Sequence, residues 1–322
     1  MNHRRLEIIG ATVIVLLLVL SYVFISYFKT YSNRVSYPHV TPYTITRYKP
    51  EYYPITLDKA IEIANKILEK EGVPIQDYYV AEAHATGSLY GIKFAVALIT
   101  YKCKYDNESM LFIWLDLLYG RPMFIDIDDP RIAPYKCPGM LLGNPEEFAE
   151  KAIRDKLEDF GYNMSGIGIK ALRVHYYEDG WLLVDYTLVI HGYLVDTSEF
   201  IPSALICLLP GGDYKIYTMW IPTPIIYIYY KGYFINPPNP LPISKDKAIS
   251  IAVNYVKNHY KLTEYKYEYQ GVYWMFHTWN KTDVLDPVPH LEHVITFWVS
   301  VKGGGQYHFN VTVDAITGKA GV

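Results

Sequence analysis

The chain has 322 residues, of which 51% are hydrophobic and 20% are charged, and its formal net charge at pH 7 is -3. This composition argues against a disordered chain, which needs low hydrophobicity and high net charge, and against a nucleic-acid-binding protein, which is usually basic. Tyrosine is the unusual component, with 33 Tyr against 12 Phe and 6 Trp. We therefore expect an ordinary globular protein with additional amphipathic aromatic surface.

The first part of the chain contains a single long apolar run. Residues 8–28 carry no charge, and their length in a helix matches the ~30 Å hydrocarbon core of a bilayer. Arg4 and Arg5 precede the run, which favours a cytoplasmic location for residues 1–7. A cleaved signal peptide or a processed pilin-like leader is the alternative, but the run is long and has no small-residue cleavage site. The sequence predicts a single-pass anchor in the cell membrane, with the rest of the chain extracytoplasmic.

Glycosylation motifs and cysteines are consistent with that location. Four acceptor motifs for N-glycosylation are present, at Asn107, Asn163, Asn280 and Asn310. Outside the cell Cys103 and Cys137 could form a disulfide, and buried free thiols are the alternative. Cys207 lies in an apolar run and is expected in the core.

Two proline-rich stretches divide the remaining chain. Residues 29–54 contain four Pro and several Tyr, which predicts a semi-stiff stalk because proline disfavours both helix and central strand. Residues 221–242 are also rich in proline and are predicted to be a linker. Three predicted units remain, at residues 55–140, 141–220 and 243–322.

The first and third units begin with nearly the same sequence. Ile55–Ala64 and Ile243–Ala252 are identical at seven of ten positions, at a constant offset of 188 residues. Thr56 and Ser244 are predicted helix N-caps, and apolar residues follow at helical spacing. A weaker copy begins at Asn144-Pro145. Each predicted helix is followed by alternating runs that are typical of antiparallel strands.

The first and third units also end alike. Asp116 and Asp314 each follow a predicted strand, and Gly120 and Gly318 come four residues later, before a basic residue. Asp can accept hydrogen bonds from nearby backbone N–H groups, and Gly supplies the positive φ that such a turn needs. We therefore interpret these residues as turn-formers rather than catalytic groups.

These features resemble the PepSY domain family. Val313–Lys319 is similar to its VDAxTGK end signature, and Ser244–Ala252 to its [ST]xxxAxxxA opening helix. The resemblance covers residues 243–322 well and 55–126 moderately, whereas the middle unit has no Asp before its turn at Leu208–Lys215. It implies a cystatin-like α+β fold and a non-catalytic extracytoplasmic module, of the kind found in protease propeptides and in regulators of envelope enzymes.

The search for catalytic chemistry gives little. The sequence contains no HExxH, GxSxG, P-loop or CxxC motif. The best metal candidates are His290, His293 and His308, with His277 nearby, since imidazoles close to a carboxylate suit zinc or copper. His290 and His293 are three residues apart at a strand entrance and would face opposite ways. We favour structural histidines, and expect no cofactor.

The tyrosines provide the candidate partner surface. They form two sets, Tyr227, Tyr229, Tyr230 and Tyr233 in one, and Tyr265, Tyr267 and Tyr269 in the other. Tyrosine is enriched at the cores of protein interfaces because it buries a large area and keeps a hydroxyl for a partner. The alternative is that these rings cover the joints between the units of the chain itself.

The sequence thus predicts an α+β protein of tandem helix-on-antiparallel-sheet units behind a transmembrane helix. We expect it to bind or regulate another envelope protein or itself, and not to be an enzyme or to bind nucleic acid. One alternative is a structural or accessory subunit of a surface assembly or membrane complex. The other is a metal-dependent extracellular enzyme that uses His277, His290, His293 and His308.

Overall fold

The computed structural model describes residues 54–86, 95–106, 109–141, 143–196, 201–260, 264–276, 289–300 and 306–322. The predictions for residues 1–53, which comprise the membrane anchor and nearly all of the stalk, lie outside the described residues. Those for Asn107, Asn280 and His277 do so as well. Among the described residues, no helix has both the length and the apolar character that a membrane span requires.

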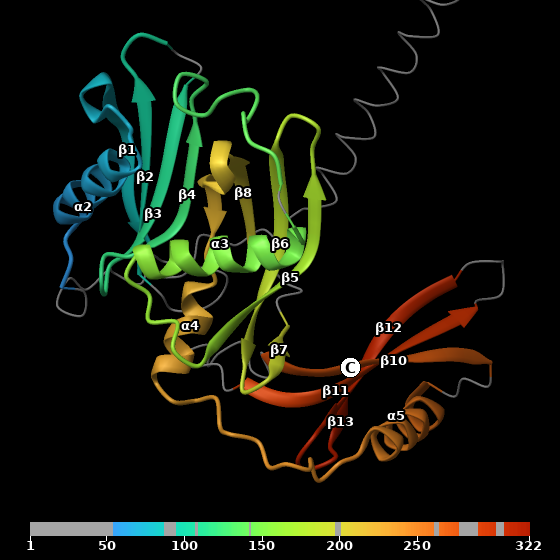
Figure 1. Cartoon of the computed structure of the whole chain (residues 1–322). Helices are drawn as coiled ribbons and strands as arrows, with labels where there is room; N and C mark the ends of the chain where they lie inside the picture. Colours follow the sequence, from blue (N-terminus) through green and yellow to red (C-terminus); the bar gives the residue numbers. More distant parts are fainter. Residues whose placement is uncertain are drawn as a thin grey trace, which may run out of the picture. The chain divides into compact units, whose positions relative to one another are not determined.

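The described chain is a mixed α+β structure with four α-helices and one large sheet (Figure 1). Its first segment, residues 57–128, comprises α2 (Leu57–Lys70), the 3-10 helix η2 (Ile75–Asp77), β1 (Tyr78–Thr86), β2 (Val96–Cys103), β3 (Met110–Asp116) and β4 (Pro122–Asp128). The second segment, residues 145–220, comprises α3 (Pro145–Asp159), β5 (Ile167–Tyr176), β6 (Trp181–Ile190), β7 (Tyr193–Val195), β8 (Ser203–Leu208), η3 (Pro210–Gly212) and β9 (Tyr214–Trp220). After α4 (Thr223–Tyr230), the third segment, residues 245–321, comprises α5 (Lys245–Tyr260), β10 (Tyr265–Phe276), β11 (Pro289–Ser300), β12 (Gln306–Asp314) and β13 (Ala320–Gly321). Each segment is a helix followed by strands.

The three segments share one sheet. Its strand order is β1-β2-β3-β4-β9-β8-β6-β7-β10-β11-β12-β13, with β5 paired to β6. The first two segments join through their last strands, because β4 and β9 pair antiparallel. The third segment joins through a short parallel pairing of β10 with β7. Because directly opposed residues share a face of the sheet, Ile113, Ile125 and Met219 form one buried row across the first junction.

The helices pack on the sheet through the apolar positions that the sequence repeats. Thr56 caps α2 by accepting a hydrogen bond from the backbone N–H of Lys59. The fully buried helix residues of the first and third segments occur at equivalent positions, Ala60, Ala64 and Leu68 in α2, and Ala248, Ala252 and Val256 in α5. Small residues at this spacing let the helix approach the sheet closely, so the repeated sequence produces the same packing twice.

The closing turns of the first and third segments are also equivalent. Oδ1 of Asp116 accepts hydrogen bonds from the backbone N–H groups two and three residues further on, and Oδ1 of Asp314 does the same. Gly120 and Gly318 have φ of 72° and 77°, where other residues are strained. In the second segment the turn follows Leu208 and uses consecutive glycines instead.

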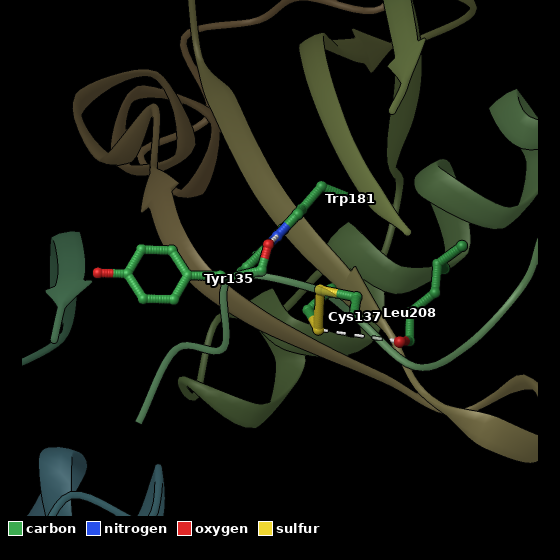
Figure 2. The surroundings of a disulfide bond; sticks show 5 residues. Tyr135, Cys137, Trp181 and Leu208 are labelled. Atoms are coloured by element: carbon green, nitrogen blue, oxygen red, sulfur yellow. Dashed lines mark hydrogen bonds between the residues drawn. A yellow bond between two sulfur atoms is a disulfide. The ribbon is translucent and has the colours of Figure 1, made fainter. Parts of the chain in front are cut away.

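The disulfide differs from the predicted one. Cys137, in the loop after β4, is bonded to Cys207 on β8, with a Cα–Cα distance of 5.4 Å (Figure 2). Cys103 is a buried free thiol, so the predicted Cys103–Cys137 bond is wrong. Cys207 is both a core residue and a disulfide partner. The bond holds the loop between the first two segments against the second, next to the hydrogen bond from Trp181 Nε1 to the carbonyl of Tyr135.

We expect peptide mapping without reduction to recover a fragment in which Cys137 is linked to Cys207. Alkylation should modify one thiol, Cys103, after unfolding. The bond closes a loop of 70 residues, so replacing both bonded cysteines by Ser should lower the free energy of unfolding by up to about 4 kcal/mol. Cys103→Ala is the control and should cost far less, because it removes no cross-link. Recovery of a Cys103–Cys137 fragment would contradict this pairing.

A buried ion pair connects the helices of the first two segments. Lys156 of α3 pairs with Glu71, the C-cap of α2, and their side chains are 12% and 6% exposed. Lys215 of β9 also donates a hydrogen bond to the carbonyl of Glu71, at 2.5 Å. Removing one partner of such a pair leaves an uncompensated buried charge. The junction between the first two segments therefore combines this polar contact with an apolar core.

Replacing Lys156 should destabilise the protein because Glu71 would lose its ion-pair partner and keep only the nearby charge of Lys215. We expect Lys156→Ala to lower the free energy of unfolding by up to about 3–5 kcal/mol. The matched control is Lys151→Ala on the same helix, which breaks an exposed pair with Asp155 and should cost less than about 1 kcal/mol. Denaturant titration of both variants measures the difference, and equal losses would refute the special role of the buried pair.

Candidate binding surface

The face of the sheet opposite α2 and α3 carries large apolar side chains. Both helices pack on the face of the buried row that contains Ile113 (Figure 1). Side chains alternate between the two faces of a strand, so Phe112 and Trp114 of β3 point to the opposite face, where both are half-buried. β3 is therefore apolar on both faces.

Three aromatic residues lie in a row across neighbouring strands on this face, and their rings pack together as a compact triangle. Trp114, Phe124 and Trp220 are directly opposed neighbours on β3, β4 and β9. Their ring centroids are 5.0 to 5.1 Å apart and their planes are inclined by 51° to 75°. Tilted and edge-to-face contacts are favourable for aromatic pairs. The row crosses the junction of the first two segments, so it depends on the pairing of β4 with β9.

A second, more polar row lies beside the rings. Asp126 of β4 is opposed by Phe112 on one side and by Thr218 on the other. Thr218 Oγ1 donates a hydrogen bond of 2.6 Å to Asp126 Oδ1. Burial raises the pKa of Asp126 and the Asp128 charge adds to this, although the Thr218 hydrogen bond opposes it. We call the whole surface the aromatic face; its apolar members are Leu98, Phe112, Trp114, Phe124, Leu183, Leu205 and Trp220.

The tyrosines of α4 differ in burial, since Tyr227 points into the protein, Tyr229 is half-buried and Tyr230 is exposed. Tyr227 is buried, and its hydroxyl donates a 2.9 Å hydrogen bond to Asp116 Oδ2. Burial raises the pKa values of both groups. Tyr229 and Tyr230 donate to backbone carbonyls of the loop before β5. The prediction of Tyr227 as a partner-surface residue is wrong, and the alternative describes it better, because α4 covers the closing turn of the first segment.

The alternating tyrosines of β10 lie against their own segment. The rings of Tyr265 and Tyr267 are 5.5 and 5.8 Å from that of Phe297, which is fully buried. The hydroxyl of Tyr269 hydrogen-bonds to Nδ1 of His293. Tyr267 is the exposed member of this set, whereas Tyr265, Tyr269 and Tyr233 are half-buried. These residues therefore support the core of the third segment more than they extend a surface.

The histidines near the end of the chain are separated by the strand geometry. His293 is 2% exposed, its Nε2 hydrogen-bonds to the carbonyl of Ile243 at 2.8 Å, and burial lowers its pKa. Nδ1 of His290 lies 3.6 Å from Oδ2 of Asp314, while His308 is exposed on β12. Within the described ranges, no group of three or more His, Cys, Asp or Glu side chains is arranged to hold a metal. The core position of His293 identifies it as a packing residue.

A cavity of about 410 Å³ lies where the end of α2 meets the loop after β4. Its charged lining includes Arg131 and Lys215. Hydrogen bonds from Arg131 hold the pKa of the buried Asp129 at about 2, and Lys215 is bonded to the carbonyl of Glu71. Because these cations already bind protein groups, we interpret the cavity as a structural joint.

The aromatic face was not predicted from the sequence, although a signal for it exists. Residues 110–116 and 122–127 are apolar at nearly every position, which is the pattern of a strand covered on both faces. Only one of these faces is covered by the described helices. An apolar strand with a single covering layer indicates either a second layer or a binding surface.

Comparisons with known proteins identify no family for this chain. No protein-family model matches it, and no curated protein does either. Among solved structures, the C-terminal domain of YpeB from Bacillus megaterium aligns with a TM-score of 0.38 and 13% identity, over 83% of this chain and 97% of that chain. An uncharacterized protein from Eubacterium rectale aligns with a TM-score of 0.41 and 11% identity, over 83% and 82%. Neither of these two proteins is described as an enzyme.

The raised pKa of Asp126 gives a pH-dependent prediction. The folded protein holds the carboxyl proton more tightly than the unfolded chain, so ionised Asp126 lowers stability at neutral pH. This cost disappears as the pH falls through the raised pKa toward the ordinary value of 3.8. We expect Asp126→Asn to be more stable than the wild type at neutral pH, with a difference that shrinks on acidification. Urea titrations at several pH values test this, with the exposed Asp213→Asn as control; a constant difference would contradict it.

Proposed function

We propose that this protein is a membrane-anchored, non-catalytic binding module whose folded part lies outside the cytoplasm and regulates or scaffolds another envelope protein. The apolar run at residues 8–28 supports the anchor, and the PepSY-like motif Val313–Lys319 supports an extracytoplasmic regulator. The observation that carries the proposal is the aromatic face. It places half-buried rings side by side on a sheet face that α2 and α3 leave open.

The composition of this face suits a protein partner. Tryptophan is the residue type most enriched among the energetically dominant positions of protein interfaces, and contiguous apolar patches on soluble proteins mark interaction sites. A sugar ring would need an aromatic ring that lies flat on the surface. Trp114, Phe124 and Trp220 are inclined to each other by more than 50°, so they present edges and gaps that apolar side chains fill better.

The two alternative functions predict different surfaces. A structural subunit would form extended homotypic assemblies larger than a dimer, which assembly measurements distinguish. A metal enzyme would need imidazoles with open nitrogen atoms directed at one point. His293 instead uses both ring nitrogens for hydrogen bonds within the core. The binding module remains the function that the described residues support best.

The test is a pull-down of the full chain after gentle detergent extraction of its native membranes. We expect one stoichiometric partner with the wild type and at least a tenfold lower recovery with Trp114→Thr, because an aromatic ring at the centre of the face contributes about 2 kcal/mol or more to binding. Threonine keeps the strand preference of the position. The control is Tyr105→Thr, which removes a more exposed ring outside the face and should leave recovery unchanged.

Two outcomes would reject the proposal. Unchanged recovery with a correctly folded Trp114→Thr, checked by circular dichroism, would remove the aromatic face as the binding site. Large homotypic assemblies without any second protein would favour the structural subunit.

A further inference from the structure

Among the described strands, the sheet has several edges where a strand has a neighbour on one side only along much of its length. β1, β5 and β10, the first strands of the three segments, each contain a bulge, at Val80/Glu82, Ala171/Arg173 and Tyr269/Gly271. Each also carries charged side chains. Bulges and charges are the devices by which soluble proteins prevent an open edge from pairing with another chain.

Within the part of the chain that the structure describes, β12 is an edge strand without these devices. It pairs with β11 without interruption from Gln306 to Asp314. On its other side, β13 pairs only with Thr312 and Val313. Residues 306–311 contain no Lys, Arg, Asp, Glu or Pro. In the first segment the equivalent strand, β3, is covered by β4 from Met110 to Leu115.

The backbone of this edge is oriented for pairing. The N–H of Asp314 donates a 2.9 Å hydrogen bond across the closing turn to the carbonyl of Lys319, so it points to the outer side of β12. Successive residues of an antiparallel strand direct their backbone groups alternately to the two sides. Gln306, His308 and Asn310 therefore direct their N–H and C=O groups outward.

Aromatic rings border the same edge. Tyr307 is 47% exposed and Tyr260, at the end of α5, is 42% exposed. The half-buried ring of Phe309 lies between them, with centroid distances of 6.2 and 5.1 Å. All three lie on the α5 side of the sheet, where Val311 is fully buried. A strand added to the edge would place its own side chains beside these rings.

We propose that a second copy of this chain pairs with this edge, with β12 antiparallel to β12 of the other copy. In such a pair, residues on the α5 side face each other, so Tyr307, Phe309 and Val311 would form aromatic and aliphatic cross-strand pairs. The absence of charged side chains means that no like charges are opposed. The junction of β4 with β9 is a precedent within the chain, because it joins two helix-covered segments antiparallel and edge to edge. The inference does not depend on the aromatic face.

The test is the association of the full chain in mild detergent, measured by sedimentation after enzymatic removal of any glycan, since Asn310 lies on this strand. We expect a concentration-dependent dimer for the wild type and for His308→Ala. His308→Pro should raise the dimer dissociation constant at least tenfold, because it removes an outward N–H. Its thermal melting should stay close to that of His308→Ala, since proline is tolerated where the N–H of an edge strand faces solvent.

Tyr307→Lys gives a second variant that leaves the backbone intact. The new lysine stands at an exposed position, so its charge stays hydrated in the monomer. In the dimer the same charge would lie opposite the equivalent lysine of the other copy or opposite an apolar ring, and both contacts are unfavourable. We expect the same loss of association. A wild-type protein that stays monomeric at all concentrations overturns the proposal. So does a dimer that neither His308→Pro nor Tyr307→Lys weakens, or hydrogen-exchange protection of β12 that appears only when a different envelope protein is added.

Discussion

The antiparallel pairing of β4 with β9 is the interaction on which most other features of the structure depend. It makes one core from two segments, because Ile125 and Met219 become neighbours in a continuous buried row. On the opposite face the same pairing places Phe124 beside Trp220 and so completes the aromatic row. It also brings the ends of α2 and α3 close enough for Lys156 to neutralise Glu71. One short ladder of backbone hydrogen bonds thus creates the junction, its polar contact and the candidate binding surface.

The closing turn shows how one local motif acquires different properties in two places. Asp116 and Asp314 accept equivalent backbone hydrogen bonds, which would lower the pKa of either carboxyl. Asp116 is fully buried beneath Tyr227, and burial outweighs those hydrogen bonds, so its pKa is raised. Burial is weaker at Asp314, where the hydrogen bonds from Thr317 prevail and the pKa is lowered. The turn is encoded locally, whereas its ionisation behaviour depends on a helix more than a hundred residues away.

The same distinction explains what the sequence could and could not predict. The apolar positions of a helix, its cap and a closing turn depend on residues that are close together in the sequence. The repeat at an offset of 188 residues therefore predicted their positions correctly. The partner of Cys137 and the aromatic row depend on which strands become neighbours, and no local pattern encodes that order. The tyrosine surplus indicated aromatic surface, but Tyr227 turned inward because its hydroxyl can be satisfied by a buried carboxylate. Phe124, which has no polar side-chain atom, and Trp114, whose single N–H is part of a larger apolar ring, occupy the open face instead.

The length of the last strand accounts for the difference between the segments. β4 and β9 each have seven residues, enough to cover the preceding strand and still offer a second edge to each other. β13 has two residues and covers only the end of β12. The bulges in β1, β5 and β10 restrict pairing at the other side of each segment. The first two segments, whose last strands are long, therefore pair with each other within the chain. The third segment, whose last strand is short, leaves most of β12 available to a strand from another chain.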